Sequence, residues 1–209
     1  QFVDSLGVNL NENTSVEHIK KSLLEIENPK ERATAATVAL QKLSLQTDKL
    51  ELLKDLFKGE NCYILSCGPT LTEHDSDKLS TLLGDTLTIS IKQAYDLFSE
   101  VTDFHVYNCA NYKKYDYSKK RPLVMEASTT PFKLGECDLK FFIRERNFDN
   151  SVSEKKNFGD WTLSAQSLLR PYGPGIMYEG VFYLLQHLGV SEATTIGWDN
   201  KLLPDGPDQ

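Results

Sequence analysis

The residues with the clearest chemical potential form a glycine-proline turn at the end of a short apolar run. Residues 61–66, Asn-Cys-Tyr-Ile-Leu-Ser, have the composition of a buried strand, and Cys67, Gly68, Pro69 and Thr70 follow directly. Because Gly68 has no side chain, a ligand can approach its backbone, and the amides of such a turn can receive a phosphate. The turn predicts a nucleotide site, although glycine and proline also punctuate purely structural loops.

Two other polar segments follow predicted strands. Asn108 comes after the apolar residues 104–107, and Gly197, Trp198 and Asp199 come after residues 193–196. In a parallel α/β sheet the carboxyl ends of the strands meet at one edge, where ligands bind. We expect both segments to converge there with the Gly68 turn. Asn108 also fits a simpler role, since asparagine favours turns.

Other candidate groups have equally plausible structural roles. Asp75 and Asp77 have the spacing of a cation-binding Asp-x-Asp motif, but they also stand where a helix would be capped. His187 lies near the end of an apolar helix, where a structural role is favoured. Residues 112–121 interleave tyrosines with basic residues and suit either a solvated loop or a contact with a base or phosphate. The arginines that could neutralise a diphosphate or carboxylate are Arg144, Arg146 and Arg170.

The elements that must position these residues alternate between helices and strands. Residues 14–58 have a helical period and predict a helical bundle or lid, with a third helix over residues 48–57. Strands are expected at residues 86–91, 104–108, 122–126, 140–144 and 193–196, with helices around 92–99 and over 176–188. Residues 145–175 have the composition of a long functional loop. The pattern predicts an α/β fold: a doubly wound, Rossmann-like, mostly parallel sheet with an N-terminal helical appendage.

We therefore divide the chain into a helical preface, residues 1–58, and a Rossmann-like nucleotide-binding domain, residues 59–209. The net charge of −7 disfavours nucleic acid as a partner. No apolar run is long enough to span a bilayer, so a cytoplasmic location is expected, with peripheral membrane association and oligomeric state left open. The cysteines, Cys62, Cys67, Cys109 and Cys137, lack metal-ligand spacing and predict structural thiols in a reducing compartment.

Taken together, these segments resemble a known family. Ile-Leu-Ser-Cys-Gly-Pro-Thr-Leu at residues 64–71 resembles the strand-GPSL signature of the bacterial sialyltransferases of glycosyltransferase family 42, and of the related motility accessory factors that glycosylate flagellin. Residues 89–95 are similar to the family's second strand and Asn-Gln stretch, and residues 106–108 to its third strand. Residues 175–199 are similar to its serine-glycine helix, leucine-glycine turn and Gly-x-Asp strand.

The resemblance implies a metal-independent glycosyltransferase that needs no cofactor beyond its donor substrate, favoured to be a CMP-sugar, and acts on a glycan or protein acceptor. Gly68, Pro69 and Thr70 would hold the nucleotide, and Gln93 and Asn108 would hydrogen-bond the nucleotide or sugar. By the same resemblance, the site also includes Cys67, Gly173, Gly175 and Asp199.

The sequence departs from the family at several points. Cys67 and Lys92 stand where the sialyltransferases have asparagine, and Gly173-Pro-Gly175 replaces the serine-glycine motif. The family's catalytic histidine lies beyond the Gly-x-Asp strand, but no histidine occurs in the ten residues after Asp199. No catalytic residue is therefore assigned.

Two alternative functions remain open. The archaeal pterin pyrophosphokinases resemble the same group and would use ATP with a divalent ion, giving Asp75, Asp77 and Asp199 a metal role. The third hypothesis is a non-catalytic nucleotide-binding or assembly module, which the missing histidine favours.

Overall fold

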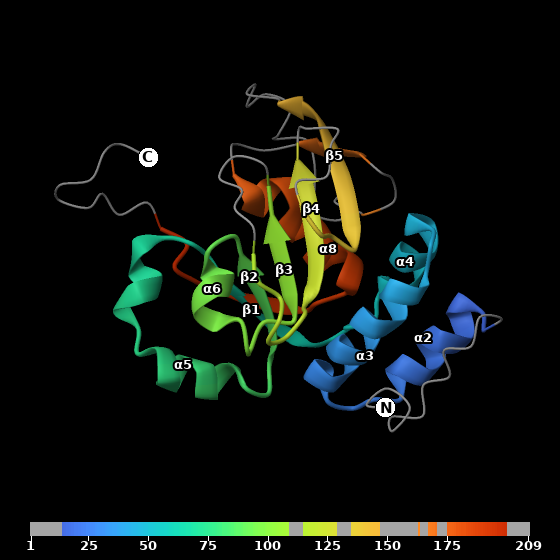
Figure 1. The fold of residues 1–209 in the computed structure, drawn as a ribbon, viewed down its shortest axis with the longest axis horizontal. Coiled ribbons are helices and arrows are strands. Elements are labelled where there is room, and N and C mark those ends of the chain that lie inside the picture. Colours follow the sequence, from blue (N-terminus) through green and yellow to red (C-terminus); the bar gives the residue numbers. More distant parts are fainter. Residues whose placement is uncertain are drawn as a thin grey trace.

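The computed structural model describes residues 14–108, 115–128, 135–146, 163, 167–170 and 175–199. These residues form one seven-stranded sheet in the order β6-β5-β4-β3-β2-β1-β7, with helices on both sides (Figure 1). Every neighbouring pair of strands is parallel. The predicted doubly wound, Rossmann-like α/β class is confirmed.

The strands are close to the predicted ones, with one addition. They are β1 (Asn61–Leu65), β2 (Leu87–Ile91), β3 (Phe104–Tyr107), β4 (Leu123–Ser128), β5 (Leu139–Arg146), β6 (Ser167–Arg170) and β7 (Glu192–Ile196). The addition is β6, which lies inside residues 145–175. Our prediction of a long loop was wrong at Ser167–Arg170, because a four-residue strand at a sheet edge leaves no readable alternation in the sequence.

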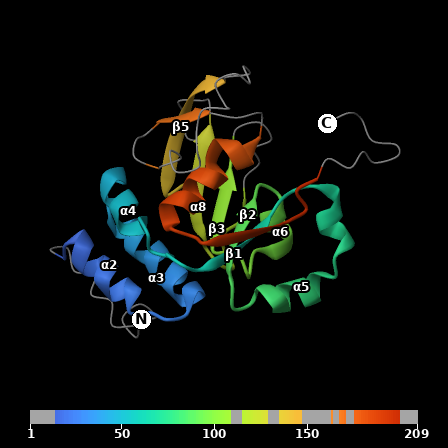
Figure 2. The same cartoon turned by 180° about the vertical axis from the view of Figure 1, so that it is seen from behind.

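Alternate residues of the strands point to opposite faces of the sheet. Ile64 of β1 joins the larger core cluster, whereas Leu65 joins a smaller one with Leu79 and Phe98. The second face is covered by α5 (Ser76–Leu83) and α6 (Ala94–Phe98). The first face is covered by the π-helical turn η3 (Met177–Val181) and α8 (Phe182–Leu188), which Figure 2 shows in front of the sheet.

Within the described residues, three helices precede the sheet: α2 (Val16–Leu24), α3 (Pro29–Lys42) and α4 (Gln46–Leu53). Ser15 caps α2, and Asn28 caps α3 with Pro29 in its first turn. The third helix was expected at residues 48–57, but it begins earlier, at Gln46, and ends earlier, at Leu53. Arg32, only 8% exposed, donates to the carbonyls of Ile26 and Leu56 and ties these helices together.

The preface helices lie beside the amino ends of the strands, not over the carboxyl ends. Lys30 of α3 reaches the carboxylate of Asp103 just before β3, and Lys49 of α4 donates to the carbonyl of Asp138 just before β5. Ile19, Leu40 and other apolar residues of the preface belong to the same core cluster as the sheet. Of the two alternatives expected for residues 14–58, a helical bundle or a lid, this position fits the bundle, whereas the division into residues 1–58 and 59–209 stays a prediction.

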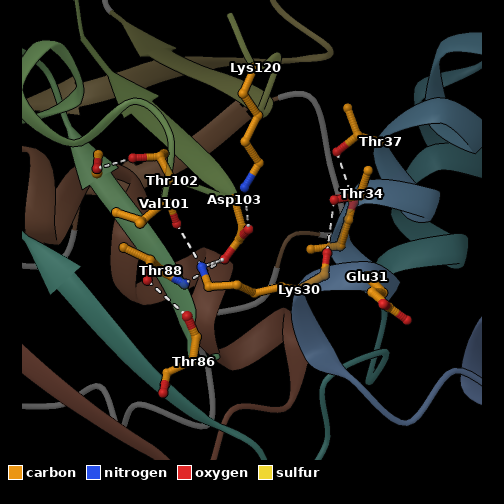
Figure 3. A network of polar contacts seen from close by, with 12 residues as sticks. Lys30, Glu31, Thr34, Thr37, Thr86, Thr88, Val101, Thr102, Asp103 and Lys120 are labelled. Carbon is orange, nitrogen blue, oxygen red and sulfur yellow. Dashed lines mark hydrogen bonds and ion pairs between the residues drawn. The ribbon is translucent and has the colours of Figure 1, made fainter. Parts of the chain in front are cut away.

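Two aspartates organise the amino ends of the central strands. Asp103 accepts from the amide of Thr88 and from Lys30 and Lys120, at 2.9, 2.9 and 3.0 Å (Figure 3). Asp138 accepts in the same way from the amide of Val124 and from Arg121, at 2.8 and 2.7 Å. Each carboxylate thus pairs with a neighbouring strand and with a cation.

None of the described helices is long and apolar enough to cross a membrane.

Candidate functional site

The direction of strand order reverses at β1. From β1 the chain adds β2 to β6 successively on one side, and β7 then pairs with the other side of β1. In open α/β sheets ligands bind outside the carboxyl ends of the strands at such a reversal. The segments that follow β1 and β7 are therefore the place to look for a site.

The turns after β1 and β7 are joined by backbone hydrogen bonds. The Ser66 amide donates to the Ile196 carbonyl and the Gly68 amide to the Gly197 carbonyl, both at 2.8 Å. A Cβ atom on Gly68 would lie 2.4 Å from the Gly197 oxygen. Gly197 has φ +71°, and its Cβ would lie 2.7 Å from that of Leu71. The absence of side chains lets the two turns approach each other.

This contact changes the role expected for Gly68. We expected the bare backbone of Gly68 to admit a ligand, but that space is occupied by the β7 turn. The amides of Gly68 and Leu71 are also engaged, in bonds to the carbonyls of Gly197 and Gly68. Gly68 therefore shapes the turn, and Pro69 begins the short 3-10 helix η1 (Pro69–Glu73) that leads away from it.

The same junction contains polar atoms without hydrogen-bond partners among the described residues. The Thr70 hydroxyl donates to Asp199 Oδ2, while Asp199 Oδ1 is buried against Gly68 without a donor. The hydroxyl of Ser66, a residue 4% exposed at the end of β1, is also buried and unpartnered. Leaving a buried carboxylate oxygen unsatisfied costs roughly 1–3 kcal/mol or more, which a donor on a ligand would offset.

Gln93 and Asn108 follow the next two strands along the same edge. Gln93 is exposed and comes after Lys92, whose φ of +47° turns the chain sharply at the end of β2. Asn108 is 8% exposed directly after β3. Neighbouring strands lie about 4.8 Å apart, so the four strands β3, β2, β1 and β7 span three spacings, about 14 Å. The residues that follow these strands are Asn108, Gln93, Gly68 and Asp199. The topology brings these four predicted residues to one edge.

The remaining predicted site residues lie in different places. Cys67 is exposed at the end of β1. Gly175 is exposed with φ +127° and precedes η3, which packs against β4 and β6. Gly173 lies outside the described residues.

The other candidate groups have structural contacts. Asp75 caps α5 by accepting from the amides of Asp77 and Lys78, as expected of a helix cap. Asp75, Asp77 and Asp199 do not gather into a metal-binding group, and no such group of three ligands occurs in the part of the chain that the structure describes. The His187 ring pairs with the Leu50 carbonyl at 2.7 Å, linking α8 to α4.

His105 is buried in a cluster of tyrosines on the second face of the sheet. Its Nε2 donates to the Lys92 carbonyl at 3.0 Å, so Nδ1 accepts from the Tyr117 hydroxyl at 2.8 Å. Burial lowers the pKa of His105 to about 4, with the Lys92 hydrogen bond opposing the shift. The ring is neutral at pH 7, and both nitrogens are engaged in structural bonds.

Sequence reasoning missed a charged pair inside the sheet. Glu126 of β4 is fully buried, and its Oε1 contacts Lys140 of β5 and the Ser128 hydroxyl. Tyr107 of β3 donates to Glu126 Oε2 at 3.5 Å. The available signal was a glutamate within an otherwise apolar strand, which is unusual in a parallel sheet buried on both faces.

No family model and no curated protein matches this chain.

Proposed function

We propose that the chain is a glycosyltransferase that transfers a sugar from a nucleotide-activated donor, favoured to be a CMP-sugar, to a glycan or protein acceptor without a metal ion. The observation that supports this most directly is the reversal of strand order at β1, which gathers the Gly68 turn, Gln93, Asn108 and Asp199 at one carboxyl edge. This is the position at which open α/β sheets bind nucleotides.

The chemistry of the edge favours a donor that carries little negative charge. Asp199 would repel a phosphate placed beside it but can accept from a sugar hydroxyl or a base amino group through Oδ1. A CMP-sugar has one phosphate, whereas UDP- and GDP-sugars have two. Lys92, at the end of β2, would offset that single charge, and the amides of Gln93 and Asn108 can each donate and accept.

Calorimetric titration tests this proposal. CMP, CDP, UDP, GDP and ATP are each titrated with and without magnesium, and selective, magnesium-independent binding of CMP is expected. Asn108→Ala should weaken CMP binding by about tenfold, the cost of about one lost hydrogen bond. The matched control is Asn61→Ala, because Asn61 is exposed at the opposite end of β1.

The other outcomes separate the alternatives. Binding of ATP only in the presence of magnesium would contradict the proposal and support a pyrophosphokinase. CMP binding without hydrolysis or transfer of the sugar of CMP-sialic acid would support a non-catalytic nucleotide-binding module.

A further inference from the structure

A cavity of about 560 Å³ lies on the second face of the sheet, beside the end of β3. Its lining includes three tyrosines, two carboxylates and one guanidinium: Tyr107, Tyr115, Tyr117, Asp116, Glu136 and Arg121. Small-molecule sites have this size and combine aromatic walls with a few polar groups. The cavity is separate from the junction of β1 and β7.

The aromatic walls are held rigidly around His105. The Tyr115 ring meets the His105 ring edge-on at 4.5 Å, and the Tyr117 hydroxyl donates to its Nδ1. Tyr107 packs 5.6 Å from the same ring. Rings fixed by several neighbours present preorganised surfaces, which lowers the entropic cost of binding.

Arg121 offers the cavity a donor with an open position. Its Nη2 donates to Asp138 at 2.7 Å, but its Nη1 is buried without a hydrogen-bond partner and lies 3.9 Å from Glu136 Oε2. The guanidinium also lies 5.8 Å from the centre of the Tyr117 ring. A hydrogen-bond acceptor on a ligand beside Nη1 would pair with this donor, which has no hydrogen-bond partner among the described residues.

The charges of the lining indicate what kind of ligand fits. Asp116 and Glu136 are exposed carboxylates, and Arg121 already shares its charge with Asp138, so the cavity disfavours an anion such as a nucleotide. Carboxylates accept hydrogen bonds from the hydroxyl groups of a sugar, and a guanidinium donates hydrogen bonds to the same hydroxyl groups. Tyrosine rings pack against the apolar face of a sugar ring.

We propose that this cavity binds a neutral sugar ring. Resting on the proposed function, the ring is a sugar of the acceptor set back from its reacting end: Arg121 and Glu136 precede β4 and β5 at the amino edge, and Tyr107 leads from there toward the carboxyl edge where the donor would bind.

Saturation-transfer NMR with lactose, methyl α-mannoside and N-acetylglucosamine tests the proposal on the full chain, because the method detects weak sugar binding. At least one of these sugars is expected to receive saturation. Glu136→Gln should weaken its binding about tenfold, as expected for one lost charge-assisted hydrogen bond. Glu51→Gln on α4, also an exposed glutamate, should have no effect.

A second pair of variants checks the location. Ser118→Arg places a bulky cation in the cavity lining and should abolish the saturation signal, whereas Ser44→Arg in the exposed α3–α4 connection should not. No signal from any of the three sugars, or equal signals in Ser118→Arg and the unmodified chain, would overturn the proposal. CMP titration of the same samples measures binding at the nucleotide site separately. A loss of CMP binding is therefore distinguishable from a loss of sugar binding in the cavity.

Discussion

At the scale of single residues, His105 has the surroundings of a structural group and not of an acid or base. Its two ring nitrogens are bonded to Lys92 and Tyr117, and it stacks on Tyr95 with ring centres 4.8 Å apart. A general base needs an open nitrogen within reach of substrate. The sequence places His105 in a predicted strand, but a strand pattern cannot reveal that tyrosines enclose the ring.

The lowered pKa of His105 predicts a pH-dependent stability. The unfolded chain binds a proton below its ordinary pKa of about 6.5, whereas folded His105 does so only near 4. Stability is therefore fully present above pH 6.5 and falls as the pH drops toward 4. Between pH 7 and pH 5 the loss from this group should be roughly 1–2 kcal/mol, measured by urea unfolding.

His105→Gln should reduce this pH dependence. Burial also lowers the pKa of His187, so part of the dependence with the same sign will remain in the His105 variant. An identical loss of stability between pH 7 and pH 5 in His105→Gln and the unmodified protein would refute this account of the ring.

At the scale of elements, the contact between the turns after β1 and β7 leaves no room for a side chain at Gly68. Gly68→Ala places a methyl group 2.4 Å from the Gly197 carbonyl oxygen, so one turn must move. We expect a loss of about 1–3 kcal/mol in unfolding free energy, measured by urea denaturation. Gly84→Ala, where the right-handed helical backbone accepts alanine, should change stability by less than about 1 kcal/mol. Equal effects of the two changes would show that the turns do not press together.

The start of β3 depends on the Asp103 carboxylate. Its side chain is fully buried and bonded to the Thr88 amide, Lys30 and Lys120. Asp103→Ala removes all three contacts and leaves the Lys30 ammonium, whose pKa is lowered mainly by burial, without its carboxylate partner. We expect a loss of about 3–5 kcal/mol in a thermal or urea unfolding experiment.

The matched control is Asp85→Ala, because Asp85 is exposed between α5 and β2. It should change the unfolding free energy by less than about 0.5 kcal/mol. A loss below 1 kcal/mol for Asp103→Ala would mean that this carboxylate contributes little to holding α3 against the sheet.

At the scale of the whole molecule, the two edges of the sheet differ in how their polar groups are used. At the amino edge, Asp103 and Asp138 are bonded to strand amides and to cations. At the carboxyl edge, Ser66 Oγ and Asp199 Oδ1 are buried without partners among the described residues. The carboxylates that tie the strands together are satisfied within the fold, whereas buried groups without partners, at the carboxyl edge and at Arg121 Nη1, are left for a ligand.

The sequence predicted the fold and the edge better than the contacts within them. Periodicity located β1 and its turn, since a buried strand followed by Gly68-Pro69 has a clear local pattern. It could not show that the β7 turn fills the space over Gly68, or that Lys120 and Arg121 bind aspartates instead of a phosphate. Those contacts join residues far apart in the chain, and local composition carries no record of them.

The measurement that tests the central claim most directly is mapping of CMP binding by ¹H–¹⁵N NMR without magnesium. The account predicts the largest shifts at the carboxyl edge, in the amides of Cys67, Thr70, Gln93, Asn108 and Asp199, with little change at Asp103 or Asp138. Shifts centred on the amino edge or on the tyrosine-lined cavity, or no shifts at saturating CMP, would contradict it.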